Sequence, residues 1–187
     1  MAGETLKTAA ELLADYADNQ AGLILPLNVR NHLIADGNDI GFVADSGPFV
    51  GTTTATYQSI LGLMPSPTFA GRFWELAPGN LLRCDFAPVL VEPGTQRLYQ
   101  SRMLGVVQKG AVQADVYEFA IFEDGVQVSL DYPVTLEQDA ATTVFAVASR
   151  LYEPGNNPEL DVRWRGVGTL DALTFDSVSF TVTGVLL

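Results

Sequence analysis

Residues 178–183 read Val-Ser-Phe-Thr-Val-Thr, and this stretch decides the fold class. Its apolar side chains and its hydroxyls alternate with a period of two, which places them on opposite faces of an extended strand. Residues 116–121, Val-Tyr-Glu-Phe-Ala-Ile, alternate in the same way but contain a single charged side chain. We therefore expect both faces of that strand to be covered. The pattern predicts a mainly β protein.

From residue 55 onward the sequence predicts strands separated by turn signals. The predicted strands are Ala55–Leu61, Phe69–Leu76, Leu81–Ala87, Leu98–Gln108, Val112–Phe122, Val126–Asp131, Thr143–Tyr152, Leu160–Gly166 and Val178–Leu187. Glu123-Asp124-Gly125 is the best hairpin candidate, because Asp-Gly supplies the positive-φ residues that such a turn needs. Since strands recur about every ten residues with no helical pattern between them, we expect a jelly-roll-like antiparallel β-sandwich over residues 55–187.

A short two-helix segment is predicted to precede the sandwich. Thr8 and Glu11 have capping-box spacing, and Pro26 suits the first position of a second helix. The side chains expected to form its contact surface are Leu12, Leu13, Tyr16, Leu27, Arg30, Leu33 and Ile34. Such short helices are marginal alone, so we interpret residues 1–36 as an anchor that docks on a partner. Residues 37–54 are interpreted as a linker with a first short strand at Phe42–Ala44.

The composition narrows the classes of partner. The 187 residues include 22 acidic and 10 basic ones, giving a net charge of −12 and no basic stripe for nucleic acid or an anionic membrane. Charged residues are 17% of the chain, below the roughly 25% of ordinary soluble domains, which indicates a surface partly hidden against neighbouring subunits. We expect no secretory leader and no transmembrane helix, since no apolar run approaches about 20 residues.

Residues that carry chemistry are few. The single histidine, His32, lies in the second predicted helix, and the single cysteine, Cys84, suits a small buried position. Hydrolase-elbow, phosphate-loop, EF-hand and zinc spacings are all missing from the sequence, so we expect no enzyme activity, no metal and no cofactor. A glycosidase-type carboxylate pair is the catalytic alternative; its candidates are Glu75, Asp115, Glu118 and Asp131.

Aromatic side chains are the other candidate site. Phe73 and Trp74 are adjacent, so on a strand one of them faces inward and the other outward. Aromatic rings near loops can pack against a neighbouring subunit or stack on a sugar. The candidates for such trimer-facing or ligand-facing positions are Phe73, Trp74, Tyr99, Tyr132 and Tyr152.

Residues 18–34, Asp-Asn-Gln-Ala-Gly-Leu-Ile-Leu-Pro-Leu-Asn-Val-Arg-Asn-His-Leu-Ile, resemble an N-terminal element of tailed-bacteriophage virion proteins. That element has an acidic helix, a polar turn with glycine, an apolar residue and proline, and a short helix with arginine and aliphatic residues. Here Leu25 stands where a hydroxyl or acidic cap is usual, and Asn31-His32 replaces the usual acid. The strand rhythm that follows is similar to the tumour-necrosis-factor and C1q-type jelly rolls of trimeric phage decoration, head-fibre and fibre-tip domains.

The resemblance implies a structural virion protein, made in the host cytoplasm: a homotrimeric capsid decoration (cement) or head-fibre protein. Its partners would be copies of itself and other virion proteins such as the major capsid protein. One alternative is a tail-fibre or baseplate receptor-binding protein that recognises a host-surface glycan. A carbohydrate-active hydrolase is a second alternative. The three hypotheses predict attachment to capsids, binding to cells or polysaccharide, and turnover of a glycan, respectively.

Overall fold

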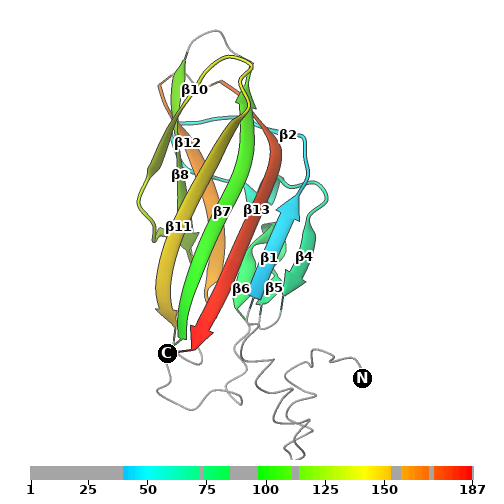
Figure 1. Ribbon diagram of the computed structural model, residues 1–187, viewed down its shortest axis with the longest axis vertical. Helices are drawn as coiled ribbons and strands as arrows, with labels where there is room; N and C mark the ends of the chain where they lie inside the picture. Colours follow the sequence, from blue (N-terminus) through cyan, green and yellow to red (C-terminus); the bar gives the residue numbers. More distant parts are fainter. Residues whose placement is uncertain are drawn as a thin grey trace, which may run out of the picture.

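Two antiparallel β-sheets packed face to face make up the described part of the protein, as Figure 1 shows. The computed structural model describes residues 40–71, 74–84, 97–110, 114–152, 157–168 and 171–186. The prediction of a mainly β sandwich is confirmed. The predicted helical anchor over residues 1–36 lies outside the described residues.

Sheet A faces the viewer in Figure 1. Its strands are β1 (Ile40–Asp45), β2 (Phe49–Gly51), β4 (Thr68–Gly71), β7 (Arg97–Lys109), β11 (Thr142–Tyr152) and β13 (Leu173–Leu186). Their order is β11-β7-β13-β1-β4, and β2 also pairs with β13. The long central pair, β7 and β13, runs from Lys109 opposite Leu173 to Arg97 opposite Leu186.

Sheet B lies behind sheet A. Its strands are β3 (Gln58–Ser59), β5 (Trp74–Leu76), β6 (Leu82–Cys84), β8 (Asp115–Glu123), β9 (Val126–Gln127), β10 (Tyr132–Leu136) and β12 (Glu159–Val167). The order is β10-β8-β12-β6-β5, with β3 paired to β12 and β9 paired to β8. Two short 3₁₀ turns, η1 (Leu61–Leu63) and η2 (Pro78–Asn80), connect the early strands.

The connections between the sheets give the topology of a jelly roll. The chain passes from sheet A to sheet B between β7 and β8, returns between β10 and β11, and crosses again on either side of β12. These crossings bring the last strand, β13, next to the first strand, β1. Long cross-sheet connections of this kind distinguish a jelly roll from a simple meander. The jelly-roll-like prediction is therefore confirmed at the level of strand order.

Large aromatic side chains fill the space between the sheets. Trp164 of β12 packs edge-to-face on Phe175 of β13, with ring centroids 5.1 Å apart, and Phe175 stacks on Phe49 at 5.1 Å. The indole Nε1 of Trp164 donates a hydrogen bond of 3.3 Å to Thr53 Oγ1. A Cβ at Gly51 would lie 2.5 Å from the Trp164 ring, so only glycine fits beneath the indole. These contacts join the two sheets into one core.

The strand boundaries differ from the predicted ones in several places. The predicted short strand Phe42–Ala44 lies within β1, and both β1 and β2 pair with β13, so sheet A begins at Ile40. The predicted strand Phe69–Leu76 is divided between β4 in sheet A and β5 in sheet B. β10 was not predicted, because Pro133 interrupts its sequence pattern; proline is tolerated here since β10 is an edge strand.

The predicted hairpin is confirmed. Glu123 of β8 pairs with Val126 of β9 across a two-residue turn. Asp124 and Gly125 have φ values of 48° and 80°, as a primed hairpin turn requires.

Candidate functional site

The outer face of sheet A has large apolar side chains that the described chain leaves partly exposed. The pleat of β7 and β11 points Leu104, Phe145 and Leu151 outward, with exposed fractions of 41%, 49% and 51%. Val50 of β2 lies on the same face and is 63% exposed. Their neighbours on β13 are small hydroxyl side chains, among them Ser177, Ser179, Thr181 and Thr183.

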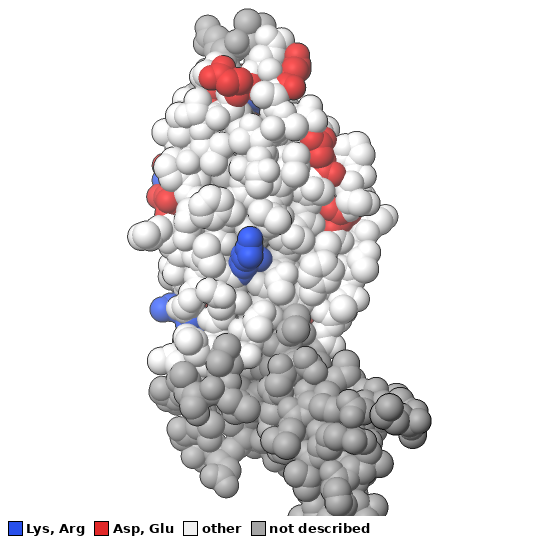
Figure 2. All heavy atoms as spheres, in the orientation of Figure 1, with Lys and Arg blue, Asp and Glu red and all other residues white. Residues whose placement is uncertain are grey.

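Charge is scarce on this face. Among the described residues of sheet A, the charged side chains that point outward are Arg102 and Asp176, and Asp176 accepts a hydrogen bond from Gln108. Asp45 and Lys109 turn inward and are buried, and Arg150 turns to Glu123 of sheet B. Figure 2 looks onto this face and shows a broad uncharged surface with a basic patch near its middle, a second basic group at its lower left edge, and acidic side chains toward its rim.

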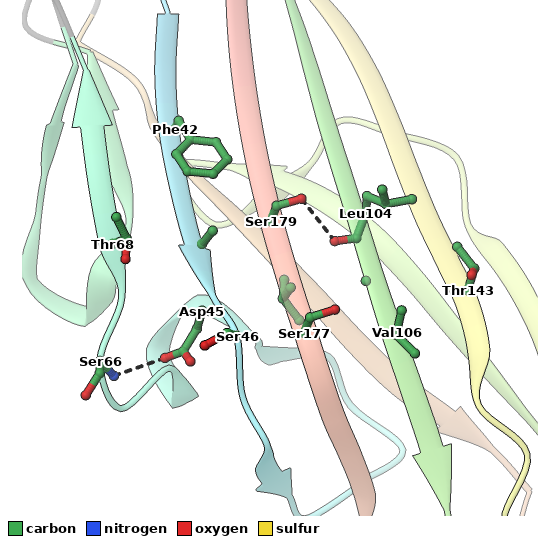
Figure 3. A pocket seen from close by; sticks show the side chains of 13 residues that line it. Phe42, Asp45, Ser46, Ser66, Thr68, Leu104, Val106, Thr143, Ser177 and Ser179 are labelled. Atoms are coloured by element: carbon green, nitrogen blue, oxygen red, sulfur yellow. Dashed lines mark hydrogen bonds between the residues drawn. The ribbon is translucent and has the colours of Figure 1, made fainter.

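A hollow of about 530 Å³ opens in the middle of the face, between β1, β13 and β7 (Figure 3). Phe42 forms one wall, Leu104 and Val106 form the other, and Ser177 and Ser179 lie between them. The depression exists because the side chains of β13 are smaller than those of the flanking strands. It is lined by apolar groups and hydroxyls, a combination that suits an apolar side chain or the face of a sugar ring.

A second, smaller hollow adjoins the first. It measures about 320 Å³ and is lined by Gln100, Arg102, Leu104, Phe145 and Val147. Leu104 borders both hollows. The outer face of sheet A therefore has two adjoining hollows that are bordered by apolar side chains.

The outer face of sheet B has the opposite character. Arg165 lies 2.6 Å from Glu118 and 3.5 Å from Asp131, measured from its Nη2 to the nearer carboxylate oxygens. Further along the same face, Arg163 Nε lies 2.7 Å from Asp161 Oδ2. Arg83 of β6 bridges to carboxylates on both sides, Glu75 at 2.5 Å and Glu159 at 3.4 Å. Charges of both signs thus alternate across β5, β6, β12 and β8.

The aromatic rings on the outer face of sheet B are covered by the protein itself. Tyr57 packs on Phe122 with ring centroids 5.0 Å apart, and the guanidinium groups of Arg163 and Arg165 lie over Phe122 and Tyr57 at 4.5 and 4.6 Å. The Tyr57 hydroxyl donates a hydrogen bond of 2.6 Å to Asp131 Oδ1. That hydrogen bond lowers the pKa of Asp131, while burial and the same bond raise the pKa of Tyr57.

Asp161 is the most buried carboxylate of this face, with an exposed fraction of 3%. It accepts hydrogen bonds from Ser59 Oγ at 2.8 Å and Arg163 Nε at 2.7 Å. Burial nevertheless raises the pKa of Asp161, because the loss of solvent outweighs these two bonds.

The aromatic candidates from the sequence are distributed differently from the prediction. Trp74 and Tyr99 are buried, with exposed fractions of 4% and 0%, and pack against each other with ring centroids 5.6 Å apart. They fill the core and offer no surface to a partner, which corrects their assignment as partner-facing residues. Tyr132 is half-buried at the edge of the sandwich, where its ring lies 5.2 Å from that of Phe145 and its hydroxyl bonds to Val147 O.

The structure does not describe the side chains of the other candidates from the sequence. Phe73, His32 and the side chain of Tyr152 fall in this group. So do the proposed anchor residues Leu12, Leu13, Tyr16, Leu27, Arg30, Leu33 and Ile34. Cys84, in contrast, is described and buried, as expected.

Two of the four strand acids, Glu118 and Asp131, lie near each other, since both approach Arg165 Nη2. Glu75 is bound to Arg83 and Glu118 to Arg165, and Asp131 accepts from Tyr57. Asp115 lies on the other side of sheet B, inside the sandwich. Each carboxylate thus has a structural partner, and Asp115 is separated from the other three by the sheet.

Within the described ranges, no group of three or more histidine, cysteine or acidic side chains is arranged to hold a metal ion. The same part of the chain has no helix long and apolar enough to cross a membrane.

No protein-family model and no curated protein sequence matches the chain. Similar solved structures include the Eiger TNF from S. frugiperda, with a TM-score of 0.40 and 7% identity over 80% of this chain and 95% of that one. Dimeric latent PorU from Porphyromonas gingivalis has a TM-score of 0.39 and 10% identity over 80% of this chain and 13% of that one. The EclA C-terminal domain, a sugar-binding protein, has a TM-score of 0.27 and 12% identity over 48% and 59% of the two chains. These similarities carry no argument about function.

Proposed function

We propose that this protein is a non-enzymatic structural protein that binds further copies of itself through the outer face of sheet A. The observation that carries the proposal is the contrast in charge between the two outer faces. Sheet A exposes Leu104, Phe145 and Leu151 on a nearly uncharged surface, whereas sheet B covers its aromatic rings with charged side chains. Contiguous exposed apolar patches on soluble proteins mark interaction sites, and depletion of charge is typical of interface cores.

The finer part of the proposal is that the assembly is a homotrimeric capsid decoration or head-fibre protein of a tailed phage. It rests on the resemblance of residues 18–34 to virion anchors and on the jelly-roll topology. Residues 1–36 would hold the protein to other virion proteins such as the major capsid protein. The net charge of −12 would keep decorated particles soluble and mutually repelling. Function here is adhesion, and no cofactor takes part.

The molar mass of the full chain in solution tests self-association. Light scattering after size exclusion should give three times the chain mass of 20.1 kDa. Phe145→Asp should convert this species to monomer, because a carboxylate buried without a partner is strongly unfavourable. Leu130→Asp is the matched control: it introduces the same charge at a 78% exposed leucine in the segment before β10 of sheet B. A wild-type monomer, or equal dissociation of both variants, contradicts the proposal.

Location in the virion needs a separate test. Removal of residues 1–36 should leave a folded sandwich that no longer joins phage particles, whereas the intact protein should be found on capsids by electron microscopy of purified particles. Full incorporation of the truncated chain would show that these residues are not the anchor.

The second candidate function is recognition of a host-surface glycan by a tail-fibre or baseplate protein. The observation that favours it is the hollow of about 530 Å³, in which the Phe42 ring stands beside the hydroxyls of Ser177 and Ser179. Sugars are bound by stacking on aromatic rings and by hydrogen bonds to such polar groups. Phe42→Ala should then abolish binding to host polysaccharide while leaving the molar mass unchanged. Absence of polysaccharide binding by the wild-type protein excludes this alternative.

A further inference from the structure

One lysine of sheet A lies inside the sandwich. Lys109 is the last residue of β7, and the pleat that points Met103 and Val107 into the core also points its side chain inward. Its exposed fraction is 1%, although lysine is almost never fully buried unless it is paired. Asp115, the first residue of β8, faces it from sheet B, and Lys109 Nζ lies 2.5 Å from Asp115 Oδ2.

A second carboxyl group borders this pair. Asp171 precedes β13, and its Oδ2 lies 3.9 Å from Lys109 Nζ. The hydroxyl of the buried Tyr117 donates a long hydrogen bond of 3.4 Å to the backbone oxygen of Asp171. Burial and the nearby carboxylates of Asp115 and Asp171 raise the pKa of Tyr117 to about 12, so its phenol stays neutral. The cluster therefore combines an amine, two carboxyl groups and a neutral phenol.

The backbone holds the amine and the carboxyl group in place from both sides. Lys109 pairs with Leu173 of β13, and its carbonyl accepts a hydrogen bond of 2.8 Å from the amide of Asp139. Asp115 pairs with Leu136 of β10. Neither residue needs to move for the two side chains to meet, so their encounter is an intramolecular one with a high effective concentration.

Burial removes solvent from the ion pair that these two groups form. A buried ammonium–carboxylate pair loses most of its solvation, and its mutual attraction often only balances that loss. Transfer of a proton from the ammonium to the carboxylate gives a neutral amine beside a neutral carboxylic acid. Those two forms are the reactants of amide formation.

We infer that Lys109 and Asp115 are joined covalently by an amide bond between the two sheets. The neutral Nζ attacks Cγ of the protonated Asp115 carboxyl group, a C–N bond forms, the C–O bond to the hydroxyl breaks, and one water molecule leaves. No oxidant or reductant is needed, because carbon and nitrogen keep their oxidation states. Cγ lies one bond of about 1.2 Å from Oδ2, which puts it within about 3.7 Å of Nζ, close to an attack distance.

Asp171 has the position of the proton carrier for this step. The attacking nitrogen of the neutral amine must lose one proton and the departing hydroxyl must gain one, and a carboxyl group beside the nitrogen can do both in turn. Asp171 is suited to this task because its side chain is 32% exposed and can exchange protons with solvent. The product is a neutral amide, which removes both buried charges and ties the end of β7 to the start of β8.

The intact mass of the purified, denatured full chain tests the inference directly. The wild-type protein should be lighter than its sequence by one water molecule, after allowance for removal of Met1. Trypsin should not cut after Lys109, so residues 103–109 and 110–150 should appear as one linked peptide. A mass equal to that of the sequence, with normal cleavage after Lys109, overturns the inference. A loss of water that maps instead to a succinimide at an Asp-Gly site overturns it as well.

Variants identify the reacting groups. Lys109→Met should restore the full sequence mass. Asp115→Asn should still form the amide but release ammonia in place of water, so that the mass lost is one unit smaller and the product has the mass of the wild-type product. Asp171→Asn should leave a larger uncondensed fraction at equal times after synthesis, whereas Asp139→Asn, at an exposed turn position near Lys109, should match the wild type. Complete condensation of Asp171→Asn at the wild-type rate would remove Asp171 from the mechanism.

Discussion

The two outer faces of this sandwich have the same pleated geometry but opposite chemistry. On sheet B, Phe122 points outward and is covered by Tyr57 and Arg163 of the same chain, so that it is only 7% exposed. On sheet A, Phe145 also points outward, yet 49% of it remains exposed. The chain covers Phe122 of sheet B with its own side chains but leaves Phe145 of sheet A half exposed. This difference indicates where a second molecule is expected and where it is not.

The contrast also separates two ways of stabilising a sheet surface. The ion pairs of sheet B each contribute little, because their side chains remain partly exposed to solvent. The exposed residues of sheet A contribute nothing until they are removed from water, at which point each buried side chain contributes through the hydrophobic effect. The ion pairs of sheet B therefore form within the single chain, while the exposed apolar side chains of sheet A gain further stabilisation only on association.

The largest loss of stability is expected for a side chain that joins the two sheets, and unfolding tests whether the sheets form one cooperative unit. Trp164→Ala removes the indole that joins β12 to Phe175 of β13 and should lower the free energy of unfolding by about 3–5 kcal/mol. Urea unfolding followed by tyrosine fluorescence and by far-UV circular dichroism should show coincident transitions in the wild type. Separate transitions would mean that the sheets unfold independently. The two outer faces would then belong to two separate folding units.

A matched pair of arginine substitutions gives the next effect. Arg165→Ala on sheet B removes its ion pairs with Glu118 and Asp131 and the cover over Tyr57, and should cost about 1 kcal/mol of stability. Within the described residues Arg102 of sheet A has no ion pair, so Arg102→Ala should change monomer stability very little.

The salt dependence tests whether the stability difference between the wild type and Arg165→Ala is electrostatic. Raising the ionic strength to about 1 M should remove much of the difference between the wild type and Arg165→Ala, because screening weakens exposed ion pairs. Urea midpoints at low and high salt provide the measurement. A stability loss for Arg102→Ala as large as that for Arg165→Ala would contradict the assignment of the ionic network to sheet B alone.

The smallest effect concerns the pH dependence of sheet B. Burial raises the pKa of Asp161, so the folded chain binds this proton more tightly than the unfolded chain does. The contribution of Asp161 to stability therefore falls as the pH rises from its ordinary pKa of 3.8 through the higher folded value. Asp161→Asn lacks this titration. The stability of the wild type relative to the variant should decrease between about pH 4 and pH 7, as measured by urea unfolding; an increase over that range would contradict the direction of the shift.

Local sequence patterns predicted the parts of the fold that depend on near neighbours. The Asp124-Gly125 turn follows from the conformational needs of a two-residue hairpin, and the outward hydroxyls of β13 follow from the alternation in residues 178–183. Proline removed the signal for β10, and glycine-rich composition removed it for β2 and for the ends of β1, of which only Phe42–Ala44 was predicted. Those strands exist because of long-range pairing with β8 and β13, which no local window contains.

The candidate surface was harder to predict than the fold. Alternation shows that a strand has two faces but not which of them meets the opposite sheet, and for this reason Tyr99 was assigned to a partner although it is in the core. A usable signal was present in β11: residues 144–148, Val-Phe-Ala-Val-Ala, are apolar on both faces. A strand of that kind has a covered outer side, and this reasoning would have identified Phe145.

The register of β1 against β13 determines at which end of the sandwich the preceding chain enters. Ile40 lies opposite Thr183, near the end of β13, so the chain that precedes the sandwich enters at the same pole as the C-terminal end of β13 (Figure 1). Lys109, the last residue of β7, lies at the far pole, opposite Leu173 at the start of β13. If residues 1–36 attach the protein to a particle, the long axis of the sandwich projects away from that particle. The end that contains the proposed Lys109–Asp115 cross-link is then outermost.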